Sequence, residues 1–227
     1  MKINITTYCG LECDTCEYRE KCHCGGCIAT GGKPFHGKCD VANCAVSKGV
    51  RFCGECADFP CETLKRYSYD AEQGDNGARI EHCKEQKHAL VAQAREGLDP
   101  IGYCGHHCDH CFLGEFCGGC RSDYDCCSYA TICEGGICPN AACVKEKQLD
   151  GCWQCEALDD CPKGYFSADD GYIAKAAALF IREYGKKDYD LAHQAIAAAG
   201  KHYPKSLPSN ANVSITLQFL CDHRPKE

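Results

Sequence analysis

The sequence predicts a small, irregular α+β fold stabilised by metal ions, in which two tandem cysteine-rich modules of short strands and knuckles are each closed by helices. Three observations predict it. Cysteine makes up about 11% of the 227 residues, a level that indicates a framework of disulfides or metals. The apolar fraction of 44% falls to roughly a third without the 26 cysteines, which is thin for a core held by burial alone. Finally, one cysteine pattern occurs twice.

The cysteine pattern of residues 8–66 recurs in the same order at residues 103–166. "YCGLECDTC" begins the first stretch and "YCGHHCDHC" begins the second, and "CGGC" follows in both. A C-x4-C pair, eight further residues and a C-x2-C pair then occur in each. A repeat with matching internal spacings indicates a duplication. We therefore expect one module at residues 1–100 and a second at residues 101–227.

Helices are expected to close each module. Over residues 76–96 apolar side chains recur at helical spacing, and Gly97 follows as a stop signal. In the second module, capping residues and apolar periodicity predict helices at 167–185 and 188–200. The alternating tail "NVSITLQF" at 212–219 predicts a strand that pairs with a sheet edge.

The matched cysteines are the predicted metal ligands. Two Cys-x-x-Cys turns bring four thiolates to one point with few residues fixed, which is the tetrahedral arrangement that zinc takes. The predicted ligands are Cys9, Cys13, Cys16, Cys24, Cys27, Cys39, Cys44, Cys53, Cys56 and Cys61, matched in order by Cys104, Cys108, Cys111, Cys117, Cys120, Cys138, Cys143, Cys152, Cys155 and Cys161. Additional candidate ligands are Cys22, His36, Cys126, Cys127 and Cys133. Cys83 and Cys221 are interpreted as structural, because free cysteine packs as a small hydrophobe.

Two metals fit these spacings. The eleven core cysteines of the first module and His36 make twelve ligands, enough for three tetrahedral zinc ions. Alternatively, the C-x3-C-x2-C triplets bring three thiolates together as a [4Fe-4S] cluster requires, which would indicate electron transfer or redox sensing in an anaerobe. The grouping of the cysteines into sites stays open.

An enzymatic role is the less favoured interpretation. Radical S-adenosylmethionine enzymes share the triplet spacing but usually carry an aromatic residue before the last cysteine, where Thr15 and His110 stand here. No nucleophile–base pair, phosphate loop or carboxylate dyad stands out in the sequence. A binding or interaction role is therefore expected, with any protein partner contacting the loops and the C-terminal helices.

Composition also bears on compartment and partners. The N-terminal "MKINITTYCG" has no export signal and no apolar run is long enough to span a membrane, so we expect a reducing cytoplasm. There, Cys-x-x-Cys pairs are far more often metal ligands than disulfides, although an export route would favour disulfides. A net charge of −7 weighs against binding to nucleic acid or to anionic lipid, so neither is an expected partner.

The first stretch also resembles a known family. "YCGLECDTC", "CGGC", "CDVANCAVSKGV" and "CGECADFPCETL", in this order, are similar to the Domain of Unknown Function 3795, a cysteine-rich module of bacteria and archaea that is generally taken to bind zinc. The resemblance is close over residues 8–95 and weaker over 103–166, where an insertion carries Cys126, Cys127 and Cys133. It implies metal binding and no particular reaction.

Overall fold

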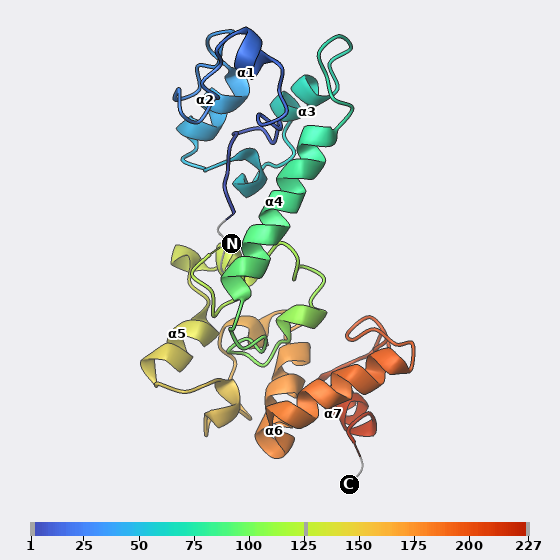
Figure 1. The fold of residues 1–227 in the computed structure, drawn as a ribbon. Helices are drawn as coiled ribbons and strands as arrows, with labels where there is room; N and C mark the ends of the chain where they lie inside the picture. Colours follow the sequence, from blue (N-terminus) through green and yellow to red (C-terminus); the bar gives the residue numbers. More distant parts are fainter. Residues whose placement is uncertain (1–2, 125–126, 226–227) are drawn as a thin grey trace. The chain divides into compact units, whose positions relative to one another are not determined.

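The computed structural model describes residues 3–124 and 127–225 of the chain (Figure 1). The chain divides into two compact units, Met1–Gln93 and Ala94–Glu227, so that helix α4 belongs to the first unit except for its last two residues. Unit 1 contains the helices α1 (Tyr18–Lys21), α2 (Asp40–Ser47), α3 (Glu62–Ser68) and α4 (Ala78–Arg95), and the 3-10 turn η1 (Cys53–Glu55). Unit 2 contains the helices α5 (Pro139–Glu146), α6 (Tyr172–Ala198) and α7 (Val213–Asp222), and the 3-10 turns η2 (Cys108–His110), η3 (Ser128–Ile132), η4 (Glu134–Gly136), η5 (Cys152–Gln154) and η6 (Gly164–Ser167).

The predicted α+β fold is wrong. The chain is 47% helical with about 1% strand, and no sheet forms within residues 3–124 and 127–225. An isolated bridge joins Ile101 and His107. The cysteine turns close on themselves instead of pairing as strands: the amide of Cys56 donates to the carbonyl of Cys53, and Cys155 to Cys152, each at 3.0 Å. Because these turns satisfy their own backbone groups, they do not need a strand partner.

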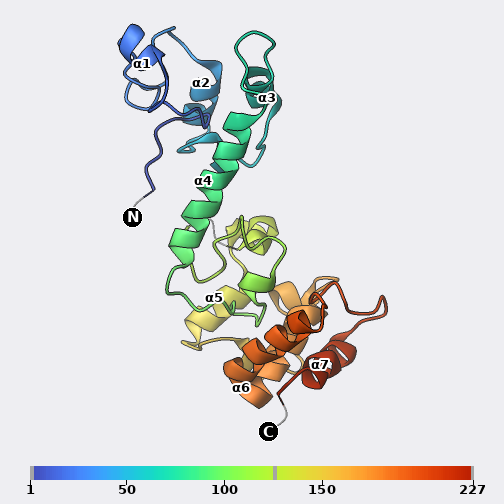
Figure 2. The ribbon, with the colours of Figure 1, turned by 45° about the vertical axis from the view of Figure 1, so that its right-hand side comes forward.

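The predicted strand at 212–219 is also wrong, because these residues lie at the start of helix α7. The side chain of Asn212 accepts a hydrogen bond from the amide of Ile215 at 3.1 Å and caps the helix. Thr216 and Leu220 are fully buried at helical spacing. Helix α7 packs along α6 (Figures 1 and 2). The buried residues lie four positions apart, on one face of a helix. The short alternation of apolar and polar residues at 212–219 therefore does not indicate a strand.

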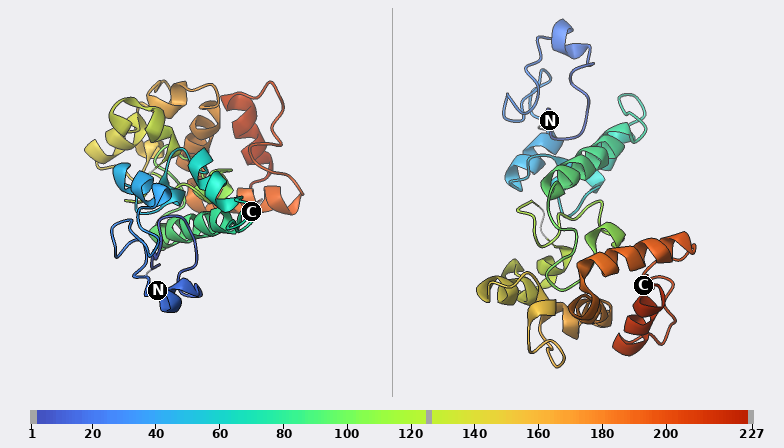
Figure 3. Two further views of the ribbon diagram at one scale, coloured as in Figure 1. Left: turned by 90° about the horizontal axis from the view of Figure 1, so that it is seen from above. Right: turned by 60° about the horizontal axis from the view of Figure 1, so that its bottom comes forward.

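The helices predicted to close the cysteine-rich segments are confirmed. Helix α4 occupies the predicted span 76–96, beginning at Ala78 and ending at Arg95. Helix α6 contains most of both predicted helices of the second module, beginning at Tyr172 and not at Ser167, as two segments that meet at Gly185 and run in different directions (Figure 3). Gly185 has φ 84° and ψ 167°, a conformation that favours glycine, so the helix changes direction there. No helix in the described part of the chain is long and apolar enough to cross a membrane.

Each closing helix packs tightly against a glycine of a Tyr-Cys-Gly turn. In unit 1, Gly10 has φ 82°, and a Cβ there would lie 2.7 Å from the sulfur of Cys83 on α4. In unit 2, Gly105 has φ 95°, and a Cβ would lie 2.7 Å from the backbone nitrogen of Ala178 on α6. Glycine is required at both positions, because they combine a left-handed backbone with a close approach of the helix.

The core of unit 2 lies between α6, α7 and the cysteine-bearing loops. Its fully buried side chains include Ile101, Phe180, Tyr189, Ile196 and Leu220. Unit 1 buries a smaller set of apolar residues, which includes Phe52, Leu64, Ile80, Cys83 and Val91. Cys83 thus packs as a core residue, with burial raising its thiol pKa to about 12.

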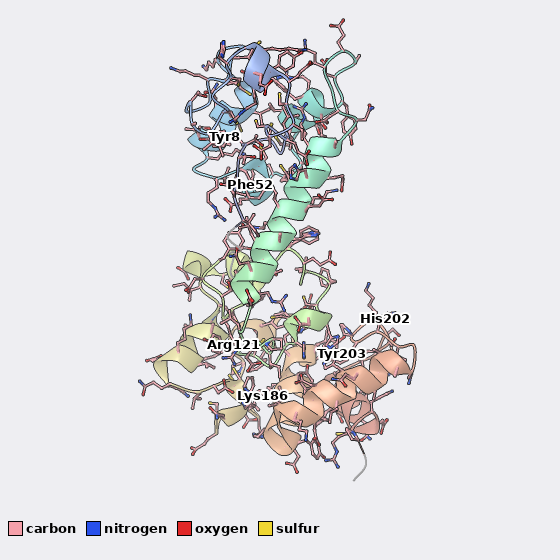
Figure 4. The ribbon with its side chains drawn as sticks, in the orientation of Figure 1. Tyr8, Phe52, Arg121, Lys186, His202 and Tyr203 are labelled. Carbon is pink, nitrogen blue, oxygen red and sulfur yellow. The ribbon has the colours of Figure 1, made fainter. Side chains whose placement is uncertain are left out.

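A charged network joins the loops of unit 2 to α6. Lys186 donates to Asp99 at 2.7 Å and to Asp150 at 2.8 Å, and Arg121 donates to the carbonyl of Asp150 at 2.6 Å (Figure 4). Both cations also lie near the ring of Trp153, at 5.7 Å for Lys186 and 6.0 Å for Arg121. The network therefore holds the start of the second C-x2-C turn, at Cys152, against the helix.

Candidate metal centres

Four cysteines of unit 1 line a small cavity. Cys44 lies on α2, and Cys61 directly precedes α3. Cys53 is the first residue of η1, and Cys56 directly follows η1. The cavity measures about 20 Å³, which is room for one water-sized particle. The ammonium of Lys48 donates to the sulfur of Cys56 at 3.5 Å. These residues place a cation beside four thiols.

Unit 2 has a cavity of the same kind and volume. It is lined by Cys143 on α5, Cys152 and Cys155 at η5, and Cys161, and it also measures about 20 Å³. Three polar side chains point at its sulfurs: Lys147 to Cys155 at 3.5 Å, Lys163 to Cys143 at 3.9 Å and Asn140 to Cys152 at 3.8 Å. We call these two sets of residues the four-cysteine cavities.

Burial makes the thiolate form costly in both four-cysteine cavities. It raises the pKa of Cys53 in unit 1, with neighbouring thiols adding to the rise. In unit 2, burial raises the pKa of Cys152 to about 12, although the hydrogen bond from Asn140 opposes it. Without a metal ion Cys53 and Cys152 are neutral thiols near pH 7, and a coordinated metal ion would remove their protons outright.

The other six matched cysteines of unit 1 form a second group: Cys9, Cys13, Cys16, Cys24, Cys27 and Cys39. Burial raises the pKa of Cys9, and the nearby thiols of Cys27 and Cys39 raise it further. Burial also raises the pKa of Cys13, together with Cys16, Cys9 and Cys24. Tyr8 (Figure 4) joins this group to the four-cysteine cavity, because its amide donates to the sulfur of Cys27 at 3.4 Å and its carbonyl accepts from the amide of Cys53 at 2.7 Å.

The corresponding cysteines of unit 2 surround a much larger cavity of about 400 Å³. Seven cysteines line it: Cys104, Cys108, Cys111, Cys117, Cys120, Cys127 and Cys138. The backbone bridge of unit 1 recurs here, since the amide of Tyr103 donates to the sulfur of Cys120 at 3.2 Å and its carbonyl accepts from the amide of Cys152 at 2.7 Å. We call this the seven-cysteine cavity.

Burial is also the largest cause of the pKa shifts of side chains that line the seven-cysteine cavity. Burial raises the pKa of Cys104 well above its usual range and that of Cys108 and Cys127 to about 12. Neighbouring thiols, Cys120 among them, add to the rise at all three. Burial also lowers the pKa of His106, on the same wall, to about 4. The thiols of Cys104, Cys108 and Cys127 and the imidazole of His106 are therefore uncharged donors near pH 7.

The structure divides the cysteines in a way that the spacing left open. The C-x4-C pair of each unit splits between two groups, because its first cysteine precedes a helix and its second lies on that helix. Thus Cys39 precedes α2 and Cys44 lies on it, while Cys138 precedes α5 and Cys143 lies on it. Lys48, Lys147 and Asn140 are neighbours of the sulfurs that the cysteine spacing did not predict. For the lysines a signal existed, since each follows the helical cysteine by four residues, which is one helical turn.

The thiols line these cavities without meeting at one point. Every described cysteine is a free thiol, and no three or more His, Cys, Asp or Glu side chains within residues 3–124 and 127–225 are placed to hold one metal ion. Metal binding would therefore require some cysteines to change rotamer. A cavity of about 20 Å³ has room for one ion, and the cavity of about 400 Å³ has room for a much larger group.

The additional candidate ligands differ in their surroundings. Cys127 lines the seven-cysteine cavity. Cys133 donates to the carbonyl of Tyr129 at 3.3 Å. Cys22 is exposed, and His36 is exposed with its ring edge against Phe35. Cys126 lies outside the described residues.

A group of histidines lies beside the seven-cysteine cavity. His110 stacks on His193 with ring centroids 4.2 Å apart and planes 2° apart, and His107 lies 5.1 Å from His193. Burial and the neighbouring histidines lower the pKa of His193 to about 2. Stacked rings direct their nitrogen lone pairs in parallel planes, so this pair does not converge on a common ion.

Comparison with known proteins supports a relationship for the first cysteine-rich segment. Residues 5–66 match the family described as a protein of unknown function (DUF3795). The match covers one copy, and it does not extend to residues 103–166. No curated protein and no solved structure matches the chain.

Proposed function

We propose that this chain is a cytoplasmic metal-binding protein whose four-cysteine cavities each hold one zinc ion that stabilises the fold. One observation carries the proposal: four cysteines at equivalent positions of the two units line cavities of equal volume, about 20 Å³ each. Zinc in structural sites is four-coordinate and accepts four thiolates. A cavity with room for one water-sized particle matches a single ion better than a cluster.

The charges around the four-cysteine cavities support this assignment. Four thiolates and one Zn²⁺ carry a net charge of −2, which needs compensation in a partly buried site. Lys147 and Lys163 in unit 2 donate to sulfurs and supply positive charge there, and Lys48 in unit 1 donates to Cys56 while it is also paired with Asp58. Such outer partners orient metal ligands and tune affinity.

We further propose that the second cysteine-rich segment is a diverged copy of the first. The same contacts recur at matched positions: the Tyr8 bridge at Tyr103, and the contact of Lys48 at Lys147. Each segment also has an eight-residue helix that carries one cysteine of its C-x4-C pair. A duplication explains these correspondences with one ancestral arrangement.

The proposed role of the zinc ions is to hold the fold. Metal binding contributes folding free energy directly, because the unfolded chain lacks a formed site. Unit 1 has a small apolar core around α4, and a bound ion would link α2, η1 and α3 to it. In this proposal the protein acts by binding a partner. The described cysteines are free thiols, as is typical of proteins in a reducing compartment.

The test is a zinc count on paired variants. The full chain is purified in zinc-containing buffer and its ions are counted by native mass spectrometry. Cys53→Ser/Cys56→Ser and Cys152→Ser/Cys155→Ser should each lose one zinc ion, whereas Cys22→Ser, at an exposed cysteine, should lose none. Unchanged zinc content in both paired variants would overturn the proposal, as would a chain that keeps its helicity and stability after complete removal of metal.

A further inference from the structure

We infer that the seven-cysteine cavity of unit 2 is a binding site for an iron–sulfur cluster and not for single metal ions. The inference rests on the proposed function in one respect, that the matched cysteines are metal ligands. It adds a second class of site to the chain, different in size and in donors from the four-cysteine cavities.

The size of the cavity is the first argument. At about 400 Å³ it is twenty times the volume of each four-cysteine cavity, at about 20 Å³. Thiolates on one zinc ion lie within roughly 3.8 Å of one another, since each Zn–S bond is about 2.3 Å and the site is tetrahedral. A space of this size has room for a cluster of several iron and sulfide ions, which a cavity with room for one water-sized particle does not have. A cluster binds each thiolate at a different iron, so that its ligands remain apart.

The number and placement of the donors form the second argument. Seven thiols are more than one tetrahedral ion uses, and four thiolates suffice for a cubane cluster. The thiol of Cys120 is near enough to Cys104, Cys108 and Cys127 to interact electrostatically with each of them, and all four line the cavity. A cluster near Cys120 therefore has ligands available on several sides.

Amide groups that point at sulfur form the third argument. Gly119 donates to the sulfur of Cys117 at 3.4 Å, and Ser128 donates to the same sulfur at 3.3 Å. Tyr103 donates to Cys120 at 3.2 Å. Hydrogen bonds to the sulfurs are one of the means by which proteins stabilise iron–sulfur clusters and set their potentials.

The remaining wall of the cavity is apolar and aromatic. Tyr129, Tyr165 and Ile173 line it, and Phe112 and Ile132 line it while remaining 77% and 79% exposed. The apolar groups of this wall lower the polarity around whatever the cavity holds, while Phe112 and Ile132 themselves stay open to water. The protection of a cluster from solvent depends on such a shell.

Unit 2 has two donors here that its counterpart lacks. Cys127 comes from the insertion in the second cysteine pattern. His106 stands where unit 1 has Leu11, and its Nδ1 is buried without a hydrogen-bond partner among the described residues. A buried imidazole nitrogen on the cavity wall is a further ligand of the kind that replaces cysteine in some clusters.

The experiment compares two Cys-x-x-Cys pairs of the same unit. The full chain is prepared without oxygen and reconstituted with ferrous and ferric iron in equal amounts, sulfide and zinc, and its iron, acid-labile sulfide, zinc and visible absorption are measured. Cys117→Ser/Cys120→Ser removes two thiols of the seven-cysteine cavity. Cys152→Ser/Cys155→Ser is the matched control in the four-cysteine cavity.

We expect the unmodified chain to be coloured, with iron and sulfide in equal amounts and zinc also bound. Cys117→Ser/Cys120→Ser should lose the colour, iron and sulfide and keep the zinc of the four-cysteine cavities. The control should keep the iron and sulfide and lose one zinc ion. Differential alkylation of the unmodified chain gives a readout that does not depend on whether the variants fold. The cysteines of the seven-cysteine cavity should react more slowly with the alkylating reagent in a chain loaded with iron and sulfide than in a chain loaded with zinc alone.

Two results would overturn the inference while leaving the proposed function intact. One is a colourless chain in which zinc alone protects these cysteines and no iron is retained. The other is iron that is lost from the control variant and kept in Cys117→Ser/Cys120→Ser. A chain that binds neither metal, with all its cysteines alkylated, would overturn the proposed function as well.

Discussion

Lys147 donates a hydrogen bond from its ammonium to the sulfur of Cys155 across 3.5 Å, and it stands one helical turn after Cys143, which lines the same cavity. Residues four apart on a helix share a face, so α5 presents a thiol and a cation to one site. Helix α2 does the same with Cys44 and Lys48. Each eight-residue helix, together with the lysine that caps its C-terminus, thus brings both a candidate ligand and a positively charged neighbour.

Replacement of this lysine should weaken zinc binding without abolishing it. Lys147→Met keeps much of the side-chain bulk but removes the positive charge and the hydrogen bond to Cys155. Loss of an outer partner of a metal ligand typically lowers affinity, here by about tenfold. A chelator titration followed by native mass spectrometry, which counts the ions on each molecule, measures this change. Lys205→Met, at an exposed lysine, is the control, and equal zinc retention in both variants would contradict the prediction.

Gly105→Ala should destabilise unit 2 strongly. The added Cβ would lie 2.7 Å from the backbone nitrogen of Ala178, and φ is 95°. Steric overlap with a helix backbone and a strained φ together should cost about 2 to 4 kcal/mol. Gly135→Ala is the matched control, because Gly135 has φ 67° but an added Cβ would meet nothing within 4 Å, so that its cost should be about 1 kcal/mol. Urea unfolding of the zinc-loaded proteins compares them, and similar midpoints for the two variants would count against the close packing of α6.

The sequence predicted the closing helices well and the cysteine regions poorly. The span 76–96 is long and periodic, and helix α4 follows it, because eighteen residues of helical pattern leave little ambiguity. The tail 212–219 is short, and its alternation fits a strand as well as it fits a helix. The segment is a helix because Asn212 caps its N-terminus and because Leu220 is buried against residues that are distant in the sequence.

Spacing indicated which cysteines belong together as a pattern but not how they group in space. A C-x4-C pair gives no sign that a helix begins between its members, so the separation of Cys39 from Cys44 had to come from the structure. The spacing of the cysteines also does not indicate the volume of the cavity that they line. The seven-cysteine cavity depends on Tyr165 and Ile173, which lie far along the chain from Cys104 and pack beside it only in the folded unit.

Two buried tyrosines of unit 2 should respond oppositely to the loss of their hydroxyl. The hydroxyl of Tyr189 is buried with no hydrogen-bond partner among the described residues, whereas that of Tyr203 donates to the carbonyl of Ile173 at 3.2 Å. An unsatisfied buried polar group is costly, so Tyr189→Phe should be neutral or stabilise the fold by about 1 kcal/mol. Tyr203→Phe should destabilise it by about 1 kcal/mol. Thermal unfolding of the two variants under equal metal loading tests the contrast, and destabilisation by Tyr189→Phe would show that its hydroxyl has a partner.

His193 should make the fold sensitive to mild acid. Burial and the neighbouring histidines lower its pKa to about 2 in the folded chain, against about 6.5 in the unfolded chain. The folded state therefore binds the proton less tightly than the unfolded state. The contribution of neutral His193 to the free energy of unfolding is fully present above about pH 6.5, and it is lost as the pH decreases towards the pKa of His193 in the folded chain. Between about pH 6.5 and about pH 5 this loss amounts to about 2 kcal/mol. His193→Phe keeps an aromatic ring against His110 and should remove that part of the acid sensitivity, while His202→Phe, at an exposed histidine, should keep it. Unfolding free energies measured across this pH range, with metal content monitored at each pH, check the prediction, and parallel pH profiles for the two variants would contradict it.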